Sequence, residues 1–151
     1  MLSQTAEYAL RAVLYIAGRP PETSIRVPEL ARATGVPRNY LAKTLHQLAR
    51  VGVLRSTRGP RGGFRLAEPA EAMTIDRVLA PFAATDTRRC LLHDRPCGVR
   101  PCAAHTRWAP VARRLDHFFG TTTVADLAGG AEGAPALDPT LHPSVTDGGL
   151  T

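Results

Sequence analysis

Residues 35–66 read GVPRNYLAKTLHQLARVGVLRSTRGPRGGFRL, and this stretch carries the clearest pattern in the chain. Its first part predicts a helix from Pro37 to about Val51, because leucines recur at three- and four-residue intervals and Gly52 follows as a stop signal. The leucines expected to face inward are Leu41, Leu45 and Leu48. The part after Gly52 is rich in Gly and Arg and contains short β-forming runs instead.

Two helices are predicted upstream of this stretch. Residues 3–18 repeat apolar side chains at helical spacing, and two prolines then stop the helix. Residues 28–34 form a shorter helix with Pro28 in its first turn, where the missing N–H costs nothing. The Gly-containing break at 35–37 joins this helix to the next one. Two helices joined by such a turn are typical of a helix-turn-helix unit.

A β-hairpin is predicted directly after the third helix. Val53–Ser56 and Gly63–Leu66 read as two short strands around a turn at residues 57–62. The glycines of the turn permit a tight bend and close approach to a phosphate or a groove wall. A basic hairpin in this position is a wing, so the predicted fold is mainly α with a small β-hairpin wing, a winged helix-turn-helix. Its four cations are Arg55, Arg58, Arg61 and Arg65.

Residues 1–84 are predicted to form the winged helix-turn-helix domain that binds DNA. The rest of the chain divides into three further parts. Residues 74–83 are expected to be a short helix within that domain, and residues 85–102 form a cysteine-rich segment. Residues 103–128 are expected to hold the longest helix, at 103–119, and a short C-terminal helix. Residues 129–151 lack periodicity and read as a disordered tail.

The 103–119 helix is a candidate dimer interface. Its apolar stripe needs a partner, and a small winged domain has little left to bury it against, although packing back onto that domain is the alternative. The stripe consists of Trp108, Val111, Leu115, Phe118 and Phe119.

Charge is distributed unevenly along the chain. Residues 1–119 hold all 19 Lys and Arg but only nine of the 13 Asp and Glu, a formal charge of +10. Such a basic body indicates a polyanionic partner. No apolar run reaches the roughly 18 residues of a membrane span, and the N-terminus lacks signal-peptide features. We therefore expect a cytoplasmic protein that does not enter membranes.

The predicted third helix and wing together supply candidate contacts to double-stranded DNA. Arg can bind guanine and Asn can bind adenine through two hydrogen bonds in the major groove. Wing arginines are placed to enter a minor groove or to contact phosphates. The candidates on the helix are Arg38, Asn39, Tyr40, Lys43 and Thr44, and those on the wing are Arg55, Arg58, Arg61 and Arg65.

Three cysteines lie within thirteen residues, at Cys90, Cys97 and Cys102. In a reducing compartment such a group indicates metal ligands or redox groups rather than disulfides. Nearby arginines lower thiol pKa values and favour the thiolate that binds metal. Soft thiolates suit iron–sulfur clusters and zinc alike, and unligated cysteines acting as a thiol switch are a further alternative.

The chain resembles the bacterial winged-helix iron–sulfur regulators of the IscR and NsrR type, the Rrf family. The resemblance covers roughly residues 1–128. It rests on AEYALRAVLYIA in the first helix, GVPRNYLAKTLHQLARVGVL, RSTRGPRGGFRLAEP and TVADL, of which RGPRGGFRL is the most specific. It implies a homodimeric transcriptional regulator, expected to be a repressor. Its operator binding would be controlled by an iron–sulfur cluster that senses nitric oxide, redox state or iron–sulfur status.

The resemblance also implies the ligands of that cluster, either [2Fe-2S] or [4Fe-4S]. Cys90, Cys97 and Cys102 match the three family cysteines, although the intervening segments here have six and four residues rather than about five each. His105, one turn beyond Cys102, matches the histidine ligand of the IscR type. Glu7 falls where some NsrR-like members use a carboxylate, and it is the alternative fourth ligand. Ala42 stands where IscR-like members carry an acid that tunes operator choice, so YLAKTL is closer to the NsrR type.

Two rival functions remain at this point. One keeps DNA binding and replaces the cluster with structural zinc or a thiol redox switch. The other is a small iron–sulfur electron carrier, which would need neither a wing nor a body of +10 charge. No Ser/His/Asp set, paired carboxylates or nucleotide-binding glycine motif is present, so an enzyme is not expected.

Overall fold

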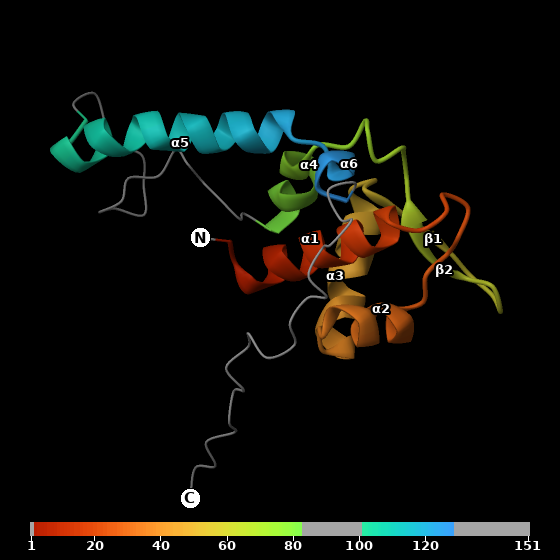
Figure 1. The fold of residues 1–151 in the computed structure, drawn as a ribbon. Coiled ribbons are helices and arrows are strands. Elements are labelled where there is room, and N and C mark those ends of the chain that lie inside the picture. Colours follow the sequence, from red (N-terminus) through yellow and green to blue (C-terminus); the bar gives the residue numbers. More distant parts are fainter. Residues whose placement is uncertain (1, 83–100, 129–151) are drawn as a thin grey trace, which may run out of the picture.

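The computed structural model describes residues 2–82 and 101–128, which form a small helical domain with a β-hairpin and one long helix (Figure 1). In chain order the elements are α1 (Gln4–Ala17), α2 (Val27–Thr34), α3 (Arg38–Arg50), β1 (Leu54–Thr57), β2 (Gly63–Leu66), α4 (Ile75–Leu79), the 3-10 helix η1 (Ala80–Phe82), α5 (Ala103–Thr121) and α6 (Val124–Ala128). The predicted winged helix-turn-helix is confirmed, with most boundaries within one or two residues. The expected disordered tail and most of the cysteine-rich segment lie outside the described residues.

The helix-turn-helix forms because α2 and α3 are joined through a left-handed turn. Gly35 has φ +69° and donates its backbone N–H to the carbonyl of Ala31, which closes α2. A side chain at this φ would be strained, so glycine is required. The leucines of α3 are fully buried against α1 and α2, as predicted, and they leave the opposite face of α3 exposed.

The wing is a two-stranded antiparallel sheet in which Arg55 pairs with Arg65 and Ser56 pairs with Phe64. Ile25 extends the sheet, because its N–H and C=O both bond to Phe64, at 2.9 and 2.8 Å. A Cβ at Gly63 would lie 2.6 Å from the carbonyl oxygen of Ile25, so glycine is needed for this close approach. The base of the wing is therefore fixed to the helical domain.

The predicted helix at 74–83 is shorter than expected. Its α-helical part ends at Leu79, and residues 80–82 continue as a 3-10 turn. Pro81 lacks the N–H that would bond to the carbonyl of Arg77, so the α-helical pattern cannot continue through it.

The long helix α5 has two different environments. At its C-terminal end Phe119 is buried with Ala6, Ile75 and Leu79, and Leu115 packs against them. Its N-terminal half extends beyond the other described elements (Figure 1). The predicted apolar stripe is thus divided, with Phe119 buried, Trp108 and Leu115 half-buried, and Val111 and Phe118 about half exposed. No helix within the described ranges is long and apolar enough to cross a membrane.

Candidate nucleic-acid interface and metal ligands

The exposed face of α3 carries the predicted base-reading side chains. Arg38, Asn39, Tyr40 and Lys43 are all exposed, and Tyr40 keeps 65% of its surface accessible. A large aromatic side chain left in solvent beside basic residues is unusual in a packed domain, and it suits contact with a base or a sugar. This face is polar and basic, whereas the opposite face forms the core.

Thr44 differs from the other candidates on α3. Only 2% of its surface is accessible, and its hydroxyl donates a hydrogen bond to the carbonyl of Tyr40, at 2.9 Å. A buried side chain with a satisfied hydroxyl cannot reach a base edge. We therefore remove Thr44 from the candidate contacts.

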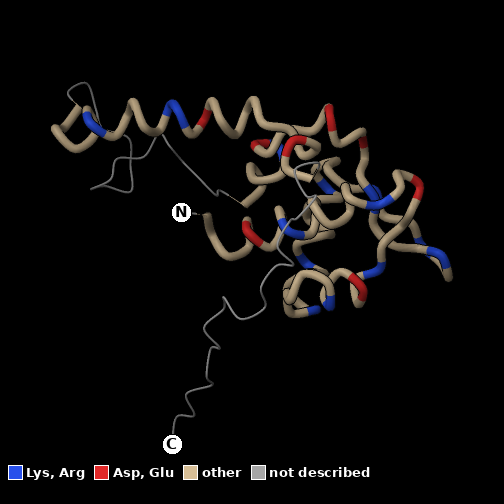
Figure 2. Tube along the Cα trace, viewed as in Figure 1, with Lys and Arg blue, Asp and Glu red and all other residues tan. Residues whose placement is uncertain are grey.

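The four wing arginines do not all lie on the same surface of the hairpin. Arg58 and Arg61 lie exposed in the turn between β1 and β2, and Figure 2 shows basic residues near the tip of this hairpin. Arg55 and Arg65 are cross-strand partners on one face of the hairpin, while Ser56 and Phe64 occupy the other face. Phe64 contacts His46 of α3, so the face with Ser56 is the one turned toward α3.

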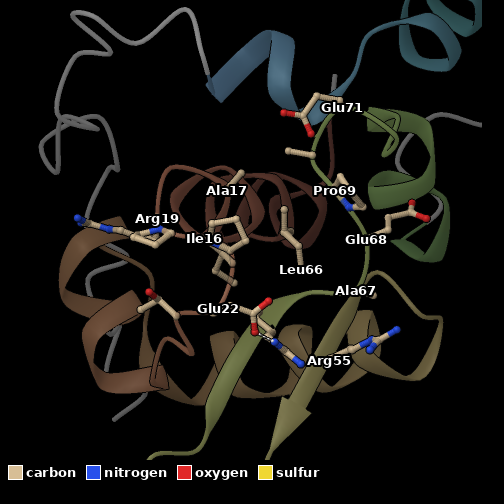
Figure 3. Close-up of a pocket in the computed structure, with 15 residues that line it drawn as sticks. Ile16, Ala17, Arg19, Glu22, Arg55, Leu66, Ala67, Glu68, Pro69 and Glu71 are labelled. Carbon is tan, nitrogen blue, oxygen red and sulfur yellow. Dashed lines mark hydrogen bonds and ion pairs between the residues drawn. The ribbon is translucent and has the colours of Figure 1, made fainter.

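Arg55 and Arg65 instead line a pocket of about 420 Å³ on the far side of the wing (Figure 3). Glu22, Glu68 and Glu71 line the same pocket, and Glu22 forms an ion pair with Arg65. Carboxylates would repel a DNA backbone at this place. The predicted wing contacts therefore divide into Arg58, which lines a groove beside α3, Arg61, which is exposed in the turn, and the pair Arg55 and Arg65, which faces away among carboxylates.

A second groove, which the sequence did not indicate, lies between the start of α2, α3 and the wing. It has a volume of about 410 Å³ and is lined by Arg26, Arg38, His46, Ser56, Thr57 and Arg58 among others. Arg26 and His46 had not been predicted as contacts. His46 could have been found from its helical spacing, three residues after Lys43 and seven after Asn39. Arg26 reaches the groove only through tertiary packing.

Cys102 and His105 are brought together at the start of α5. Cys102 is the N-cap, and its Sγ accepts a hydrogen bond from the backbone N–H of His105, at 3.3 Å. The positive end of a helix favours a thiolate at this place. The Nδ1 atom of His105 is buried and has no hydrogen-bond partner within the part of the chain that the structure describes. A buried imidazole nitrogen one helical turn after a cysteine is a residue pair of the type that binds metal.

The other proposed ligands are placed less directly. Cys90 and Cys97 lie outside the described residues. Glu7, the alternative fourth ligand, lies in the first turn of α1 and forms an ion pair with Arg11. Within residues 2–82 and 101–128, no three His, Cys, Asp or Glu side chains converge on one point. Two of the four main candidate ligands, Cys102 and His105, thus lie close together at the start of α5. The alternative ligand, Glu7, already pairs with Arg11.

Sequence comparison identifies related proteins along most of the chain. The Rrf2 family model, described as an iron-dependent transcriptional regulator, matches residues 2–130. A protein of Aquifex aeolicus whose name places it among HTH-type transcriptional regulators is 36% identical over 131 residues, which are 84% of this chain and 90% of that protein. The HTH-type transcriptional regulator IscR of Yersinia pseudotuberculosis is 28% identical over 127 residues, covering 83% and 77% of the two chains.

Solved structures show the same fold. CymR, the global cysteine regulator of B. subtilis, superposes with a TM-score of 0.75 at 19% identity, and the match covers 87% of this chain and 98% of CymR. T. potens IscR superposes with a TM-score of 0.73 at 19% identity and covers 89% and 90%. These relatives are transcriptional regulators and not enzymes.

Proposed function

The chain belongs to the Rrf2 family of transcriptional regulators, and we propose that it is a cytoplasmic, homodimeric repressor whose operator binding answers to an iron–sulfur cluster. The signal in this proposal is nitric oxide, redox state or iron–sulfur status. The observation that carries the DNA-binding part is the joint exposure of the polar face of α3 and the arginines on the α3 side of the wing. The cluster part depends on the pairing of Cys102 with His105.

DNA binding is supported by how charge is arranged around α3. Arg38 and Lys43 lie on its exposed face, Arg58 of the wing lines one groove together with Arg38, and Arg61 is exposed in the same turn as Arg58. The far side of the wing is mixed in charge, because Glu22, Glu68 and Glu71 lie there with the arginines. We propose that α3 enters the major groove and that the wing contacts the adjacent backbone or minor groove. Arg38 and Asn39 are the residues expected to read bases.

Homodimer formation is supported by α5. Its N-terminal half extends beyond the winged domain, and it leaves Val111 and Phe118 about half exposed, seven residues apart on one helix face. A second copy of α5 would cover both side chains. Two-fold symmetry would also place two recognition helices on two half-sites about one helical turn apart, roughly 34–36 Å.

The donor set fits an iron–sulfur cluster held by Cys90, Cys97, Cys102 and His105. When bound, a cluster with one nitrogen ligand supplies redox and nitric-oxide reactivity. The chain itself supplies a thiol at a helix N-terminus and the buried Nδ1 of His105. The backbone N–H of His105 donates to Cys102 Sγ and stabilises negative charge on that sulfur.

The test begins with anaerobic purification, a visible absorbance spectrum, and iron and sulfide analysis before and after addition of nitric oxide. We expect broad absorbance between about 300 and 500 nm with matching iron and sulfide. DNA binding is then compared between the loaded and the cluster-free protein, using duplexes enriched from a random pool. A reporter repressed by the loaded form would support the repressor assignment.

Cys97→Ala is the sharpest variant for the cysteine ligands. It should remove the cluster while circular dichroism shows an unchanged helical fold, and unaltered cluster content would contradict the ligand assignment. His117→Ala, an exposed histidine of α5, serves as a control that should keep the cluster.

A second candidate keeps the DNA-binding assignment and replaces the cluster with a thiol switch or structural zinc. The likeness to CymR favours it, since that protein is titled a cysteine regulator, although the likeness itself shows only the fold. Colourless protein after cluster reconstitution, containing zinc or no metal, would support this candidate. Reversible loss of DNA binding on mild oxidation would then distinguish the thiol switch from zinc.

A further inference from the structure

Among the residues that the structure describes, those lining the groove between the start of α2, α3 and the wing carry charge of one sign only. Arg26, Arg38 and Arg58 line it from three different parts of the fold, and no carboxylate is among the other described lining residues. The pocket on the far side of the wing, of similar volume, has three glutamates among its lining residues. Three guanidinium groups around one groove of about 410 Å³ repel one another, so this groove suits an anion.

The groove also contains hydroxyl and aromatic groups that define how an anion would be held. Ser56 and Thr57 of β1 line it and can donate hydrogen bonds. The ring of His46 lies edge-on to Phe64, with centroids 5.4 Å apart and an interplanar angle of 77°. This contact orients an exposed imidazole that lines the same groove.

His46 is the lining residue that can be either neutral or positively charged, because a neutral imidazole keeps one nitrogen that accepts a proton. The charged groups around it are Arg26 at the start of α2, Arg58 of the wing and Arg38 of α3, together with Lys43 and Arg50 one turn away on α3. All five are cations. A phosphate in the groove would be the one opposite charge there, and it would favour protonated His46 in the complex.

We propose that this groove holds a backbone phosphate of DNA and that His46 enters the complex as an imidazolium. Each protomer then takes up a proton from solvent as it binds. DNA affinity is therefore linked to pH through a residue of the recognition helix that reads no base. This inference rests on the proposed DNA-binding function and adds a proton-linked phosphate site to it.

The experiment measures the dissociation constant of the anaerobically purified full chain for an enriched duplex, from about pH 6 to about pH 8 at constant ionic strength. Binding should weaken roughly three- to tenfold per protomer across this range, because the cost of protonating His46 grows as pH rises. Titration calorimetry in two buffers of different ionisation enthalpy should show proton uptake approaching one per protomer.

Two variants isolate the residue responsible. His46→Gln keeps a hydrogen-bond donor but cannot gain charge, so its affinity should resemble that of the parent near pH 8 and should vary little with pH. Arg26→Gln should weaken binding at every pH and lower the salt dependence by about one unit, since it removes a phosphate contact. His117→Gln is the matched control and should keep the full pH dependence, because any pH effect of the cluster itself is common to all of these proteins.

The outcomes separate this inference from the function on which it rests. Equal pH dependence in the parent and in His46→Gln would overturn the inference while leaving DNA binding intact. Proton uptake with inorganic phosphate alone, equal to that with DNA, would assign the groove to a small anion and overturn the DNA assignment. Failure of both loaded and cluster-free protein to bind any duplex would overturn the proposed function together with the inference.

Discussion

The side-chain amide of Gln47, on α3, donates a hydrogen bond to the backbone carbonyl of Pro81, at 2.9 Å. This bond joins the recognition helix to the 3-10 turn η1, which immediately precedes residues 83–100 with two of the three cysteines. Gln47 is exposed, so its side chain serves to connect these two elements rather than to fill the core.

Because this hydrogen bond joins two elements, substitutions of Gln47 should lower the free energy of unfolding by graded amounts. Gln47→Ala removes the donor and should lower the free energy of unfolding by about 1 kcal/mol. Gln47→Glu places an acceptor against the Pro81 carbonyl and should lower it further. Thermal unfolding of the two variants tests the order, and equal midpoints would show that the hydrogen bond does not persist in solution.

The two faces of the wing should respond differently to loss of charge. Arg58→Ala should weaken DNA binding and reduce the slope of affinity against salt concentration by about one unit, because it removes a phosphate contact. Arg55→Ala, its control on the far face, should change that slope little. Fluorescence anisotropy at several salt concentrations measures both. A larger effect from Arg55→Ala would reverse the orientation of the wing that we assign.

The fourth cluster ligand can be assigned by comparing His105→Ala with Glu7→Gln. We expect His105→Ala to lower iron content and to alter the visible spectrum, because His105 follows Cys102 by one helical turn and its buried Nδ1 has no hydrogen-bond partner among the described residues. Glu7→Gln should retain the cluster, since Glu7 already pairs with Arg11. Iron and sulfide analysis of both proteins decides the matter. Cluster loss only in Glu7→Gln would transfer the ligand role to that carboxylate.

The exposed apolar face of α5 should be needed for dimer formation. Phe118→Asp would place a charge in the proposed interface and should weaken the dimer at least tenfold, since burying one such side chain contributes about 1.5–3 kcal/mol. Arg113→Asp, about 140° away around the same helix, is the control and should leave the dimer intact. Sedimentation velocity across a range of protein concentrations distinguishes them, and a parent protein that is monomeric throughout would refute the interface.

The start of α6 should make stability depend on pH in the acid range. The backbone N–H of Thr123, which donates to Asp126 Oδ2, and then the Thr123 hydroxyl hold the pKa of that carboxyl below its usual value. The same hydroxyl accepts a hydrogen bond from the backbone N–H of Asp126. A lowered folded-state pKa stabilises the fold above the unfolded value of about 3.9, and the benefit is lost as pH falls through the folded value. Asp126→Asn should therefore unfold at a lower temperature than the parent at about pH 6, with the difference disappearing toward about pH 3. Glu71→Gln, an exposed acid, should show no such pattern.

Local patterns predicted the elements of this fold better than the directions of individual side chains. The leucine spacing of α3 and the Gly-rich turn of the wing were sufficient for the winged helix-turn-helix. The same spacing also predicts that Thr44 is buried, because it lies three residues after Leu41 and four before Leu48 and so shares their face of the helix. Strand alternation likewise separates Arg55 from Ser56. The prediction grouped Thr44 and Arg55 with the other candidates because residue type was given more weight than position, whereas the structure buries Thr44 and places Arg55 on the far face of the wing.

Other features could not be predicted from neighbouring residues. Arg26 precedes α2 and reaches the groove only because Ile25 pairs with Phe64 across a separation of nearly forty residues. The hydrogen bond between Gln47 and Pro81 depends on how α4 and η1 pack near α3. The spacing of residues along the sequence does not predict that packing. The division of the α5 stripe arises from α1 and α4, which cover only its C-terminal end.

The sulfur of Cys102 has a structural task apart from any metal, since it completes the hydrogen bonding of the first turn of α5. The sulfur atom that we propose as a cluster ligand is therefore also the atom that caps the N-terminus of α5. Alkylation of this sulfur removes the negative charge of the thiolate and weakens it as an acceptor, so the first turn of α5 should fray when the thiol is alkylated. Far-ultraviolet circular dichroism would then register the chemical state of Cys102 as a small change in helix length, without a chromophore and without DNA.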